Sequence, residues 1–487
     1  MLSEIFKAYD VRGIYKQNLT EEIAYKIGRA FVYFLKCKDV VIGIDMRLSS
    51  PKLSKAFMNG VIEQGVNAIF IGEVCTDAVY FASGFLRKPA VMFTASHNPK
   101  QYNGMKFCRE DAIPINYNTG LQKIKSIIEK KQYQKSKIKK FGKTIKKDVL
   151  KNYVAHVRKF IDVKRLRKLK IAVDAGNGMA GKIVPLAYKN LTIKIIPLYF
   201  KLDGTFPNHP ADPSKSENLT ELQKTVKEKK CDFGIGFDGD ADRIFFVDEN
   251  GETINSSLIS ALIIKNILLK KKSNASELVA GERVSSRASH VDACENASHA
   301  RVQLTRTRSQ LYEKIIYNLV CSHIVPETIK KYYGIPMLER VGHSFIKETM
   351  RKTKALFACE HSAHYYYRDN YRADSGIITS LIVSEIVSIE NRSLSELLDE
   401  FRKYHTIEET SVEVKNKEAK LKEIKSIYKK QNPNKISKLD GVSVEFDEWW
   451  FNVRPSNTEP LLRLNLEANS EELMKEKRDE LVRLLKN

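Results

Sequence analysis

The sequence predicts an α/β fold that consists of three similar α/β units in tandem and a smaller C-terminal α+β unit. Three observations carry this prediction. A short apolar run, a helical stretch and a second apolar run recur three times, which is the pattern of a βαβ unit. A chain of 487 residues needs several hydrophobic cores, because single cores stop growing near ~250 residues. The region from residue 391 onward carries strand and helix patterns of its own.

The first unit begins with residues 40–44, an apolar run of Val, Ile and Gly that predicts a buried strand. A helical stretch at 51–63 follows and leads to a second apolar run at 68–71. A further short strand is predicted at 91–93, where Val-Met-Phe runs into a polar turn. These runs together predict a βαβ unit with an additional strand.

Two more units repeat this pattern. The second has strands at 170–173 and 193–198 around a helix near 183–189, and the third has strands at 315–319 and 336–340 around a helix at 325–333. Between them, apolar runs at 233–237 and 244–247 predict a pair of strands, and residues 376–389 predict a later helix. Three similar units in tandem account for this repetition.

The composition is that of a globular protein. Hydrophobic residues make up 43% of the chain and aromatic residues 9%, and no apolar run approaches the ~18 residues of a membrane span. The N-terminus lacks the basic and apolar regions of a signal peptide, and the seven cysteines show no paired spacing. We therefore expect a reducing, cytoplasmic compartment, no zinc site and no membrane partner.

The formal charge of +23 is compatible with two kinds of partner. A basic nucleic-acid-binding protein is one alternative. However, the Lys and Arg residues are spread along the whole chain, and no helix-turn-helix, zinc-finger or RNA-binding signature accompanies them. The denser basic run at 123–151 is typical of a solvated face. A positive field equally attracts an anionic, phosphorylated metabolite, which is the interpretation that we favour.

The stretch at 91–107, VMFTASHNPKQYNGMKF, predicts a reactive site. Its strand ends in a polar turn that holds Ser96 and His97, and Pro99 prevents a helix from following. Lys106 stands behind an Asn-Gly turn. A nucleophile, a group that can handle a proton and a cation are thus packed together. The alternative is an ordinary polar surface turn.

Three carboxylates follow the strand at 233–237 in the sequence DGDADR. Alternation places Asp238, Asp240 and Asp242 on one side of an extended backbone. Carboxylates this close repel one another unless a cation neutralises them, and all-oxygen ligation suits Mg2+. An EF-hand calcium loop is the rival, but Arg243 stands where that loop needs glycine, and strands flank the segment. A solvated acidic turn is a further alternative.

Three more segments predict polar contacts with a ligand. Arg12 follows a short apolar segment and can present a guanidinium to an anion. Glu360, Ser362 and His364 share one loop, and such donors and acceptors suit sugar hydroxyls. Near the C-terminus, the sequence predicts a phosphate nest. It consists of the side chains and main-chain N–H groups of Arg454, Ser456, Asn457 and Thr458.

The segment at 273–312 interrupts the repeated pattern. It is rich in Ser, Ala and Arg, shows no sustained period, and stands where a short connection is expected. We therefore predict an inserted, mobile surface loop. His290 and His299, with Cys294 between them, are a weaker metal-site alternative that lacks a supporting frame. The lysine-rich stretch at 405–440 is predicted to be a linker in part.

Five short motifs occur in one order across nearly the whole chain: TASHNP, YNGMK, DGDADR, EHSAH and RPSNTEP. Together they resemble the α-D-phosphohexomutases, and the EHSAH form is similar to the phosphomannomutase/phosphoglucomutase branch. The resemblance implies four domains around a central cleft, the first three with one mixed α/β core. The expected domains carry the phosphoserine, metal-binding, sugar-binding and phosphate-binding loops in turn, at 1–147, 148–252, 253–390 (with the insertion) and 391–487.

The resemblance also implies the activity. The expected enzyme is an isomerase that interconverts hexose 1-phosphate and hexose 6-phosphate, of mannose, glucose or both. Its phosphoryl carrier would be a phosphoserine at Ser96, and a sugar 1,6-bisphosphate would be its intermediate and activator. One Mg2+ per chain is implied, with Asp238, Asp240, Asp242 and phosphorylated Ser96 as ligands. The partner is then a small phosphosugar and not nucleic acid, and no oligomeric state is predicted.

Residue types suggest roles in such a reaction. Arg12 and Arg243 would stabilise the transferring phosphoryl group, while Lys106 or His343 would handle the proton of the sugar hydroxyl. Glu360, Ser362 and His364 would bind the sugar, and the nest around Arg454 would bind its phosphate in either orientation of the intermediate. Two candidates remain. His97, beside the serine, is a catalytic candidate, and Tyr9 is a candidate substrate contact.

Three places depart from the family pattern, and one of them is the insertion at 273–312. Relatives usually have glycine before the glutamate of the sugar loop, and Cys359 at this position restricts the backbone conformations that are accessible. Residues 320–323 lack the basic residue that is common beside the corresponding turn. Phosphoglucosamine mutase is the alternative enzyme. Its sugar loop usually resembles EQSGH, so His361 and Ala363, which stand at the Gln and Gly positions of that loop, count against it.

Overall fold

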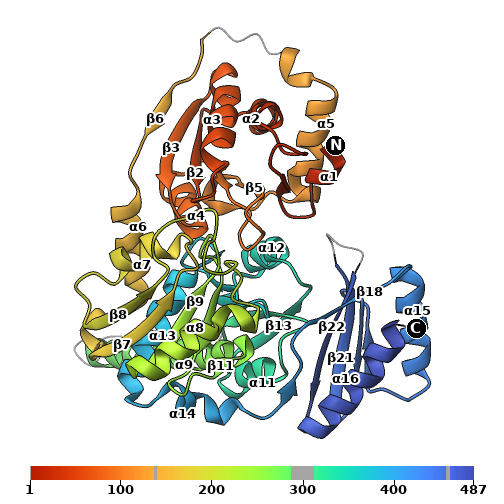
Figure 1. The fold of residues 1–487 in the computed structure, drawn as a ribbon. Coiled ribbons are helices and arrows are strands. Elements are labelled where there is room, and N and C mark those ends of the chain that lie inside the picture. The colour runs from red at the N-terminus through yellow and green to blue at the C-terminus, as the bar shows by residue number, and fades with distance from the viewer. Residues whose placement is uncertain (1, 136–139, 287–311, 457–460, 487) are drawn as a thin grey trace, which may run out of the picture.

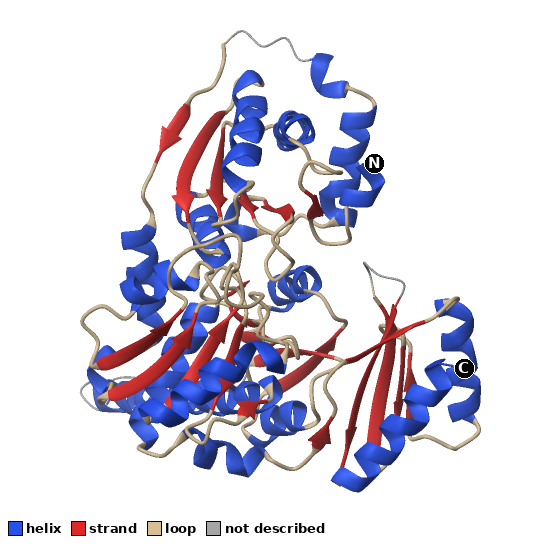
Figure 2. Ribbon diagram, viewed as in Figure 1, coloured by secondary structure: helices blue, strands red, loops and turns tan. Residues whose placement is uncertain are grey.

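The computed structural model describes residues 2–135, 140–286, 312–456 and 461–486. It contains four β-sheets that follow one another along the chain, with helices packed on them (Figures 1 and 2). The first sheet lies at the top of Figure 1, the second and third lie below it, and the fourth lies to the right. The predicted α/β class is confirmed, with three mixed sheets followed by an antiparallel one.

The first sheet consists of β1 (Val11–Ile14), β2 (Asp39–Ile44), β3 (Asn67–Glu73), β4 (Ala90–Phe93), β5 (Tyr102–Cys108) and β6 (Thr144–Lys146). Its strand order is β1-β5-β4-β2-β3-β6. β2 is parallel to both β3 and β4, β5 is antiparallel to β4, and β1 is antiparallel to β5. The predicted βαβ unit is confirmed, since α3 (Ser50–Glu63) joins β2 to β3.

Two helices of this unit, α2 (Glu21–Leu35) and α3, pack closely because each has a glycine at their crossing. A Cβ atom on Gly28 would lie 2.3 Å from the carbonyl oxygen of Phe57, and one on Gly60 would lie 2.3 Å from that of Tyr25. Any side chain at either position would force the helices apart. The other helices of the unit are α1 (Leu2–Ile5), α4 (Thr76–Leu86) and α5 (Gln122–Glu129).

The second and third sheets repeat one scheme. The second contains β7 (Leu169–Asp174), β8 (Ile193–Leu198), β9 (Phe233–Phe237), β10 (Ile244–Val247) and β11 (Thr253–Ile254), in the order β11-β10-β9-β7-β8. The third contains β12 (Lys314–Asn318), β13 (Ile335–Glu339), β14 (Phe357–Cys359), β15 (Tyr365–Tyr367) and β16 (Ala373–Asp374), in the order β13-β12-β14-β15-β16. In each sheet three parallel strands are followed by two antiparallel ones, as in the core of the first sheet.

The helices of these two units are α6 (Leu150–Val157), α7 (Ala180–Ala187), α8 (Thr220–Lys229), α9 (Ser256–Ser286), α11 (Ile324–Lys331), α12 (His343–Thr353), α13 (Gly376–Glu390) and α14 (Leu394–Leu398). The predicted connections are confirmed, with α7 between β7 and β8 and α11 between β12 and β13. The prediction of a loop from residue 273 is wrong for 273–286, which extend α9. Residues 287–311, with His290, Cys294 and His299, lie outside the described part of the chain.

The fourth unit is a separate α+β layer. Its sheet contains β17 (His405–Thr406), β18 (Thr410–Glu413), β19 (Lys435–Ser437), β20 (Val442–Glu445), β21 (Trp449–Pro455) and β22 (Leu461–Ala468), and the helices are α15 (Lys417–Lys429) and α16 (Glu471–Lys486). The prediction of a partial linker at 405–440 is wrong, because this stretch forms three strands and α15. α15 is fixed to the sheet by the buried side chains of Ile424 and Tyr428.

Three main apolar cores hold these layers. One lies between the first sheet and α2, α3 and α5. A second, larger core joins α4 of the first unit to the apolar interiors of the second and third units. The third belongs to the fourth unit alone. Among the helices of the described residues, none is long and apolar enough to span a bilayer.

Candidate active site

Three loops meet where the first three sheets face one another, and they occupy equivalent places in those sheets. Each connects the last strand of the parallel trio to the antiparallel strand beside it. The β4–β5 loop carries Ser96, the β9–β10 loop carries Asp238, Asp240 and Asp242, and the β14–β15 loop carries residues 360–364. Ligands bind at the carboxyl ends of parallel strands, so this edge is the expected position of a site.

Ser96 is held in a strained conformation and faces the acidic loop. Its φ angle is +50°, in the left-handed region that non-glycine residues seldom adopt. Its main-chain N–H donates to Thr94 Oγ1 at 2.9 Å, and its hydroxyl donates to Oδ2 of Asp238 at 2.5 Å. The ring of His97 lies beside it, with Nδ1 3.4 Å from Ser96 Oγ. The predicted serine and the predicted acidic cluster are therefore in direct contact.

The three aspartates form a buried cluster. An oxygen atom from each of Asp238, Asp240 and Asp242 lies within 4.8 Å of the others. The backbone between β9 and β10 is a turn with Ala241 at φ +61°, and not the extended segment that the sequence pattern suggested. Burial, followed by repulsion from Asp242 and Asp240, raises the pKa of Asp238 to about 7. Burial and mutual repulsion therefore disfavour the state in which all three carboxylates are ionised.

The oxygen atoms of this cluster fit a hard divalent cation. Among the described residues, Oδ1 of Asp240 and Oδ1 of Asp242 are buried and accept no hydrogen bond. Buried anionic oxygens that accept no hydrogen bond are costly, and a cation that prefers carboxylate ligands removes this cost. The opposite oxygen of Asp240 is already saturated, because it accepts from Lys106 Nζ at 2.7 Å and from Thr76 Oγ1 at 2.6 Å.

Three cations surround the loops of Ser96 and the aspartates. Lys106 also donates to Asp242 at 2.5 Å. Although burial acts to lower the pKa of Lys106, Asp240 and Asp242 raise it well above its ordinary value. Arg243 donates from Nε to Asp238 Oδ2 at 3.1 Å. Arg12 lies on β1 and donates to the side chains of Asp10 and Asn98, each at 2.5 Å.

Two histidines near the site have lowered pKa values, which favours the neutral imidazole. Burial, then the cations Arg243 and Arg12, lowers the pKa of His97 well below its ordinary value. Burial, then Lys347 and Lys106, has the same effect on the pKa of His343, the first residue of α12. The ring of His343 lies against Tyr9, with 5.4 Å between centroids, and the Tyr9 hydroxyl donates to Val341 O at 3.2 Å.

The β14–β15 loop reaches the acidic cluster. Nε2 of His364 lies 3.5 Å from Oδ1 of Asp242, and its Nδ1 lies 3.1 Å from the hydroxyl of Ser362. Burial acts to lower the pKa of His364, but the contact with Asp242 raises it overall. Glu360 is buried and accepts hydrogen bonds from Tyr366 and from the main-chain N–H of Gly342. The predicted sugar loop thus lies beside the predicted metal loop.

The predicted phosphate nest lies in the fourth unit. Arg454 of β21 donates to Oε2 of Glu409 at 2.6 Å, and Arg463 of β22 donates to Oε1 of the same carboxylate at 2.7 Å. Ser456 follows Arg454 and donates its N–H to Leu461 O at 2.9 Å. The last two residues of the predicted nest, Asn457 and Thr458, lie outside the described residues.

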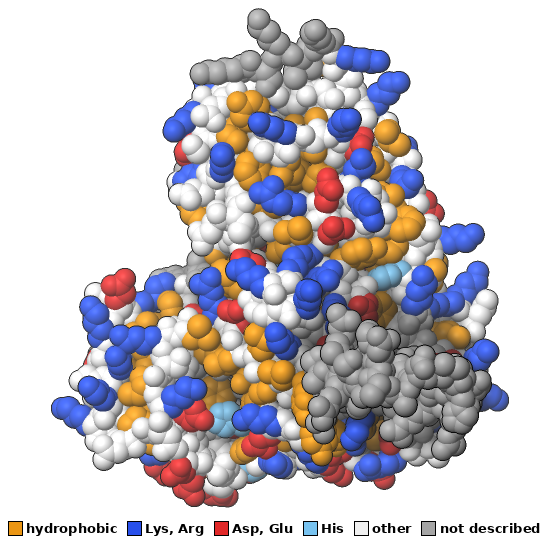
Figure 3. All heavy atoms as spheres, turned by 180° about the vertical axis from the view of Figure 1, so that it is seen from behind, with side chains coloured by type: hydrophobic (Ala, Val, Ile, Leu, Met, Phe, Trp, Pro, Cys, Tyr) orange, Lys and Arg blue, Asp and Glu red, His pale blue; other side chains and the backbone are white. Residues whose placement is uncertain are grey.

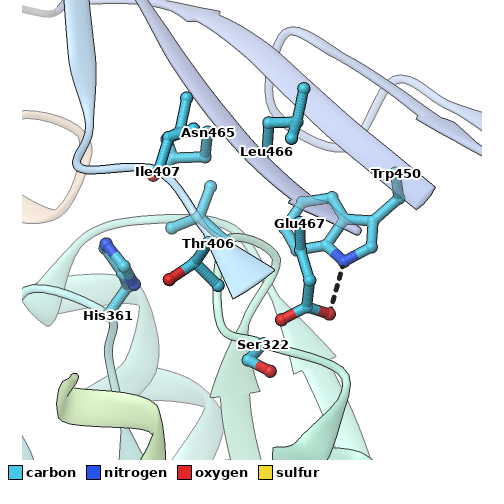
Figure 4. Close-up of a pocket in the computed structure, with 9 residues that line it drawn as sticks. Ser322, His361, Thr406, Ile407, Trp450, Asn465, Leu466 and Glu467 are labelled. Carbon is cyan, nitrogen blue, oxygen red and sulfur yellow. Dashed lines mark hydrogen bonds between the residues drawn. The ribbon is translucent and has the colours of Figure 1, made fainter. Parts of the chain in front are cut away.

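A small pocket lies where the fourth unit meets the third, away from Ser96. Figure 4 shows Trp450 and Glu467 of the fourth sheet facing Ser322 and His361 of the third unit. Trp450 donates its indole N–H to Glu467 at 2.9 Å. His361 belongs to the β14–β15 loop, so this pocket connects that loop to the sheet that carries Arg454.

Sequence reasoning missed three residues that hold the site together. Thr76 donates a hydrogen bond to Asp240, and Arg47 donates hydrogen bonds to the main chain of the Ser96 loop. Glu409 accepts a hydrogen bond from the guanidinium of Arg454. Thr76 and Arg47 are polar residues just after β3 and β2, so their position at strand ends was an available signal. Glu409 stands in a lysine- and glutamate-rich stretch, where no local pattern distinguishes it.

A solved structure with this architecture identifies the class of protein. An X-ray structure of a phosphoglucomutase/phosphomannomutase family protein from Burkholderia thailandensis matches with a TM-score of 0.81 and 28% identity, covering 100% of this chain and 98% of that one. The four-sheet fold, with the serine loop beside the acidic loop, is therefore that of an enzyme that isomerises hexose phosphates.

Family models for all four domains of one family match the chain in order. The models for phosphoglucomutase/phosphomannomutase alpha/beta/alpha domains I, II and III match residues 3–135, 151–251 and 297–404, and the C-terminal domain model matches residues 409–484. The chain belongs to the phosphoglucomutase/phosphomannomutase family. The resemblance drawn from the five motifs is confirmed.

Curated relatives match over the full length. A phosphomannomutase of Vibrio cholerae is 36% identical, with 99% of this chain and 98% of that protein covered. A phosphomannomutase of Methanocaldococcus jannaschii is 37% identical, with 99% and 97% covered. The expected activity, a hexose phosphate mutase, is thus confirmed at the level of the family.

Proposed function

We propose that the chain interconverts the 1- and 6-phosphates of mannose, and also of glucose, through a phosphoserine at Ser96 and a sugar 1,6-bisphosphate. One observation carries this proposal. The Ser96 hydroxyl is buried at a strand end and donates to Asp238, inside a cluster in which two buried carboxylate oxygens accept no hydrogen bond. The names of the two phosphomannomutase relatives support mannose phosphate as a substrate.

The acidic cluster is proposed to hold one Mg2+. Asp238, Asp240 and Asp242 would bind it, together with a phosphate oxygen on Ser96. When bound, Mg2+ would offset negative charge on the phosphoryl group as that group moves between Ser96 and a sugar hydroxyl. Lys106 keeps the carboxylates of Asp240 and Asp242 oriented for this purpose, because it donates to one oxygen of each and leaves the other oxygen available.

The transferring phosphoryl group would be bound by Arg243 and Arg12. Arg243 already contacts Asp238, and Arg12 contacts Asn98 two residues beyond Ser96. His343 is proposed to accept the proton of the sugar hydroxyl, because its lowered pKa leaves a neutral imidazole. Lys106 suits this role less well than His343, since its raised pKa keeps it protonated. His97 lies against Ser96 and would contact the phosphorylated form.

The substrate is proposed to lie between the β14–β15 loop and the nest at Arg454. Glu360, Ser362 and His364 would bind the sugar hydroxyls, and Tyr9 would line the same side through its contact with His343. The distal phosphate would be bound by a guanidinium, hydroxyls and an amide of the fourth unit: Arg454, Ser456, Asn457 and Thr458. A phosphate clamp of this kind accepts the intermediate in both orientations.

The domain assignment that accompanies this function is 1–147, 148–252, 253–390 and 391–487, around a cleft that these loops line. A cytoplasmic location stays a prediction. The nucleic-acid alternative receives no support from the part of the surface drawn in colour in Figure 3. On the face shown in Figure 3, Lys and Arg side chains are scattered among apolar, acidic and other groups, and no single basic stripe runs across it.

The decisive experiment measures both phosphoryl transfer and turnover. Dephosphorylated protein is incubated with glucose 1,6-bisphosphate and Mg2+, and the modified peptide is identified by mass spectrometry. One phosphate on the Ser96 peptide and turnover of mannose 1-phosphate and glucose 1-phosphate are expected. Turnover by Ser96→Ala at the parental rate would overturn the covalent mechanism, and a preference for glucosamine 1-phosphate would favour the alternative enzyme.

A further inference from the structure

Arg47 is a fully buried cation that has no direct part in the proposed phosphoryl transfer. It follows β2, and its side chain has 0% exposure. Its charge is balanced by Asp45, whose Oδ2 lies 3.3 Å from Arg47 Nε. A buried arginine is costly unless its donors are used, so the partners of its remaining N–H groups indicate what the residue does.

Those partners are four main-chain carbonyl groups of one loop. Nη2 donates to the oxygens of Ser96 at 2.8 Å and Asn98 at 2.5 Å. Nη1 donates to the oxygens of Pro99 at 2.8 Å and Tyr102 at 3.0 Å. The guanidinium therefore binds the chain at four points between the end of β4 and the start of β5. A planar fork with several fixed donors is required for this, and an ammonium group cannot reproduce it.

The second unit covers this guanidinium from the other side. The ring of Phe206 lies 5.1 Å from Arg47 Cζ. The backbone approaches closely as well, since a Cβ atom on Gly204 would lie 2.7 Å from Arg47 Cα and 2.6 Å from Met46 O. Arg47 is thus enclosed between the Ser96 loop and a segment of the unit that supplies the aspartates.

We propose that Arg47 is the positioning residue of the nucleophile. Its guanidinium holds Ser96 in the left-handed conformation that aims Oγ at Asp238. This conformation is unfavourable for serine by itself, so surrounding groups must impose it. Because Arg47 acts through the main chain and not on the sugar, it affects the rate of phosphoryl transfer and leaves sugar binding unchanged. The inference rests on the proposed role of Ser96.

The test compares Arg47→Lys with the parent. A displacement of the nucleophile by about 1 Å lowers the rate about 100-fold, so kcat is expected to fall by that order while KM for the sugar phosphates stays unchanged. The rate of Ser96 phosphorylation by glucose 1,6-bisphosphate, followed by mass spectrometry, is expected to fall in parallel. If Arg47 had a purely structural role, a variant with the parental thermal unfolding midpoint would keep the parental rate of Ser96 phosphorylation.

The matched control is Arg351→Lys. Arg351 donates to three main-chain carbonyls, those of Asp111 at 2.5 Å, Tyr371 at 2.8 Å and Lys347 at 3.3 Å, but it bonds neither to the Ser96 loop nor to the acidic loop between β9 and β10. It is expected to lose stability at most and to keep kcat and the phosphorylation rate. An equal loss of rate in this control would overturn the proposal.

Two further results would also overturn it. The first is a folded Arg47→Lys protein with parental kcat and phosphorylation rate. If that variant does not fold, the double variant Arg47→Gln with Asp45→Asn, which leaves no unpaired charge, replaces it; failure of both to fold assigns Arg47 a structural role only. Ser96→Ala is measured in parallel. Turnover by that protein would refute the covalent mechanism itself, whereas an inactive Ser96→Ala with a normal Arg47→Lys refutes only the positioning role.

Discussion

The hydroxyl of Thr76 donates to Oδ2 of Asp240 at 2.6 Å, and the main-chain N–H of Thr76 donates to the carbonyl oxygen of Asp240 at 3.0 Å. The two residues stand 164 positions apart in the chain. Thr76 opens α4 in the first unit, and Asp240 lies in the acidic loop of the second. This pair of bonds fixes both the side chain and the backbone of the central aspartate, and it orients the oxygen that is proposed to bind metal.

Replacement of Thr76 by Val should weaken Mg2+ binding. The side chain keeps its shape but loses the hydroxyl, so Oδ2 of Asp240 loses one of its two donors. Removal of such a supporting partner weakens metal affinity about 10-fold or more. Thr76→Ser should restore it. Calorimetric titration with Mg2+ measures the affinity directly, and Thr379→Val, which removes a buried hydroxyl bonded to Tyr367, serves as the control. Unchanged Mg2+ affinity in Thr76→Val would contradict the assignment.

Replacement of Arg454 by Ala should raise KM for mannose and glucose phosphates alike. A charge-assisted hydrogen bond contributes ~1.5–3 kcal/mol, which corresponds to a rise of about tenfold or more. Steady-state kinetics on both sugars provide the measurement. Arg463→Ala is the comparison, because it removes the other arginine partner of Glu409 and leaves Arg454 in place. An increase confined to one sugar would argue against a shared phosphate clamp.

Glu409 should make the fourth unit sensitive to acid. Burial acts to raise its pKa, but Arg454 and Arg463 lower it from 4.5 to about 2. Because the folded-state pKa lies below that of the unfolded chain, the stabilisation is present above about pH 4.5 and is lost as pH falls toward 2. A shift of this size corresponds to at most about 3 kcal/mol.

The corresponding measurement compares thermal unfolding of the parent and Glu409→Gln between pH 2 and pH 7. The parent is expected to be the more stable protein near neutral pH, and the difference should shrink as Glu409 becomes protonated. A difference that stays constant over this range would show that the two arginines do not control the ionisation of Glu409.

Lys347 and Asp374 form a buried ion pair whose disruption should be strongly destabilising. Lys347 Nζ lies 2.6 Å from Asp374 Oδ1, and each side chain is 1% exposed. Lys347→Met leaves the buried carboxylate of Asp374 without its lysine partner, and breaking a buried ion pair in this way costs ~3–5 kcal/mol. Chemical denaturation measures this loss. The double variant Lys347→Met with Asp374→Asn should recover a large part of it, and a double variant as unstable as the single one would refute the ion-pair explanation.

The repeated strands could be predicted because their signal is local. Residues 40–44, 170–173 and 315–319 are apolar runs followed by polar turns, and each became the central parallel strand of its sheet. α15 was missed although its signal was present. Ile424 and Tyr428 stand four positions apart and form a buried face, but the many lysines around them suggested a linker.

Other features had no local signal at all. Residues 273–286 contain few large apolar side chains, so the continuation of α9 follows no apolar period. The acidic loop was found from its composition, but alternation predicted an extended backbone where the chain turns. The contacts of Thr76 with Asp240 and of Arg47 with the Ser96 loop depend on how the units pack, and a pattern within one segment does not reveal a partner in another.

The distribution of the apolar cores determines at which positions the chain could be cut into parts that do not expose a large apolar surface. The core that includes α4 runs without interruption through the second and third units, so a cut between these three would expose a large apolar surface to water. The fourth unit has a core of its own and meets the third through polar contacts such as that of Glu467 with the His323 N–H at 3.0 Å. Recombination could therefore exchange the fourth unit between related genes as one segment, while the serine and the aspartates are inherited together.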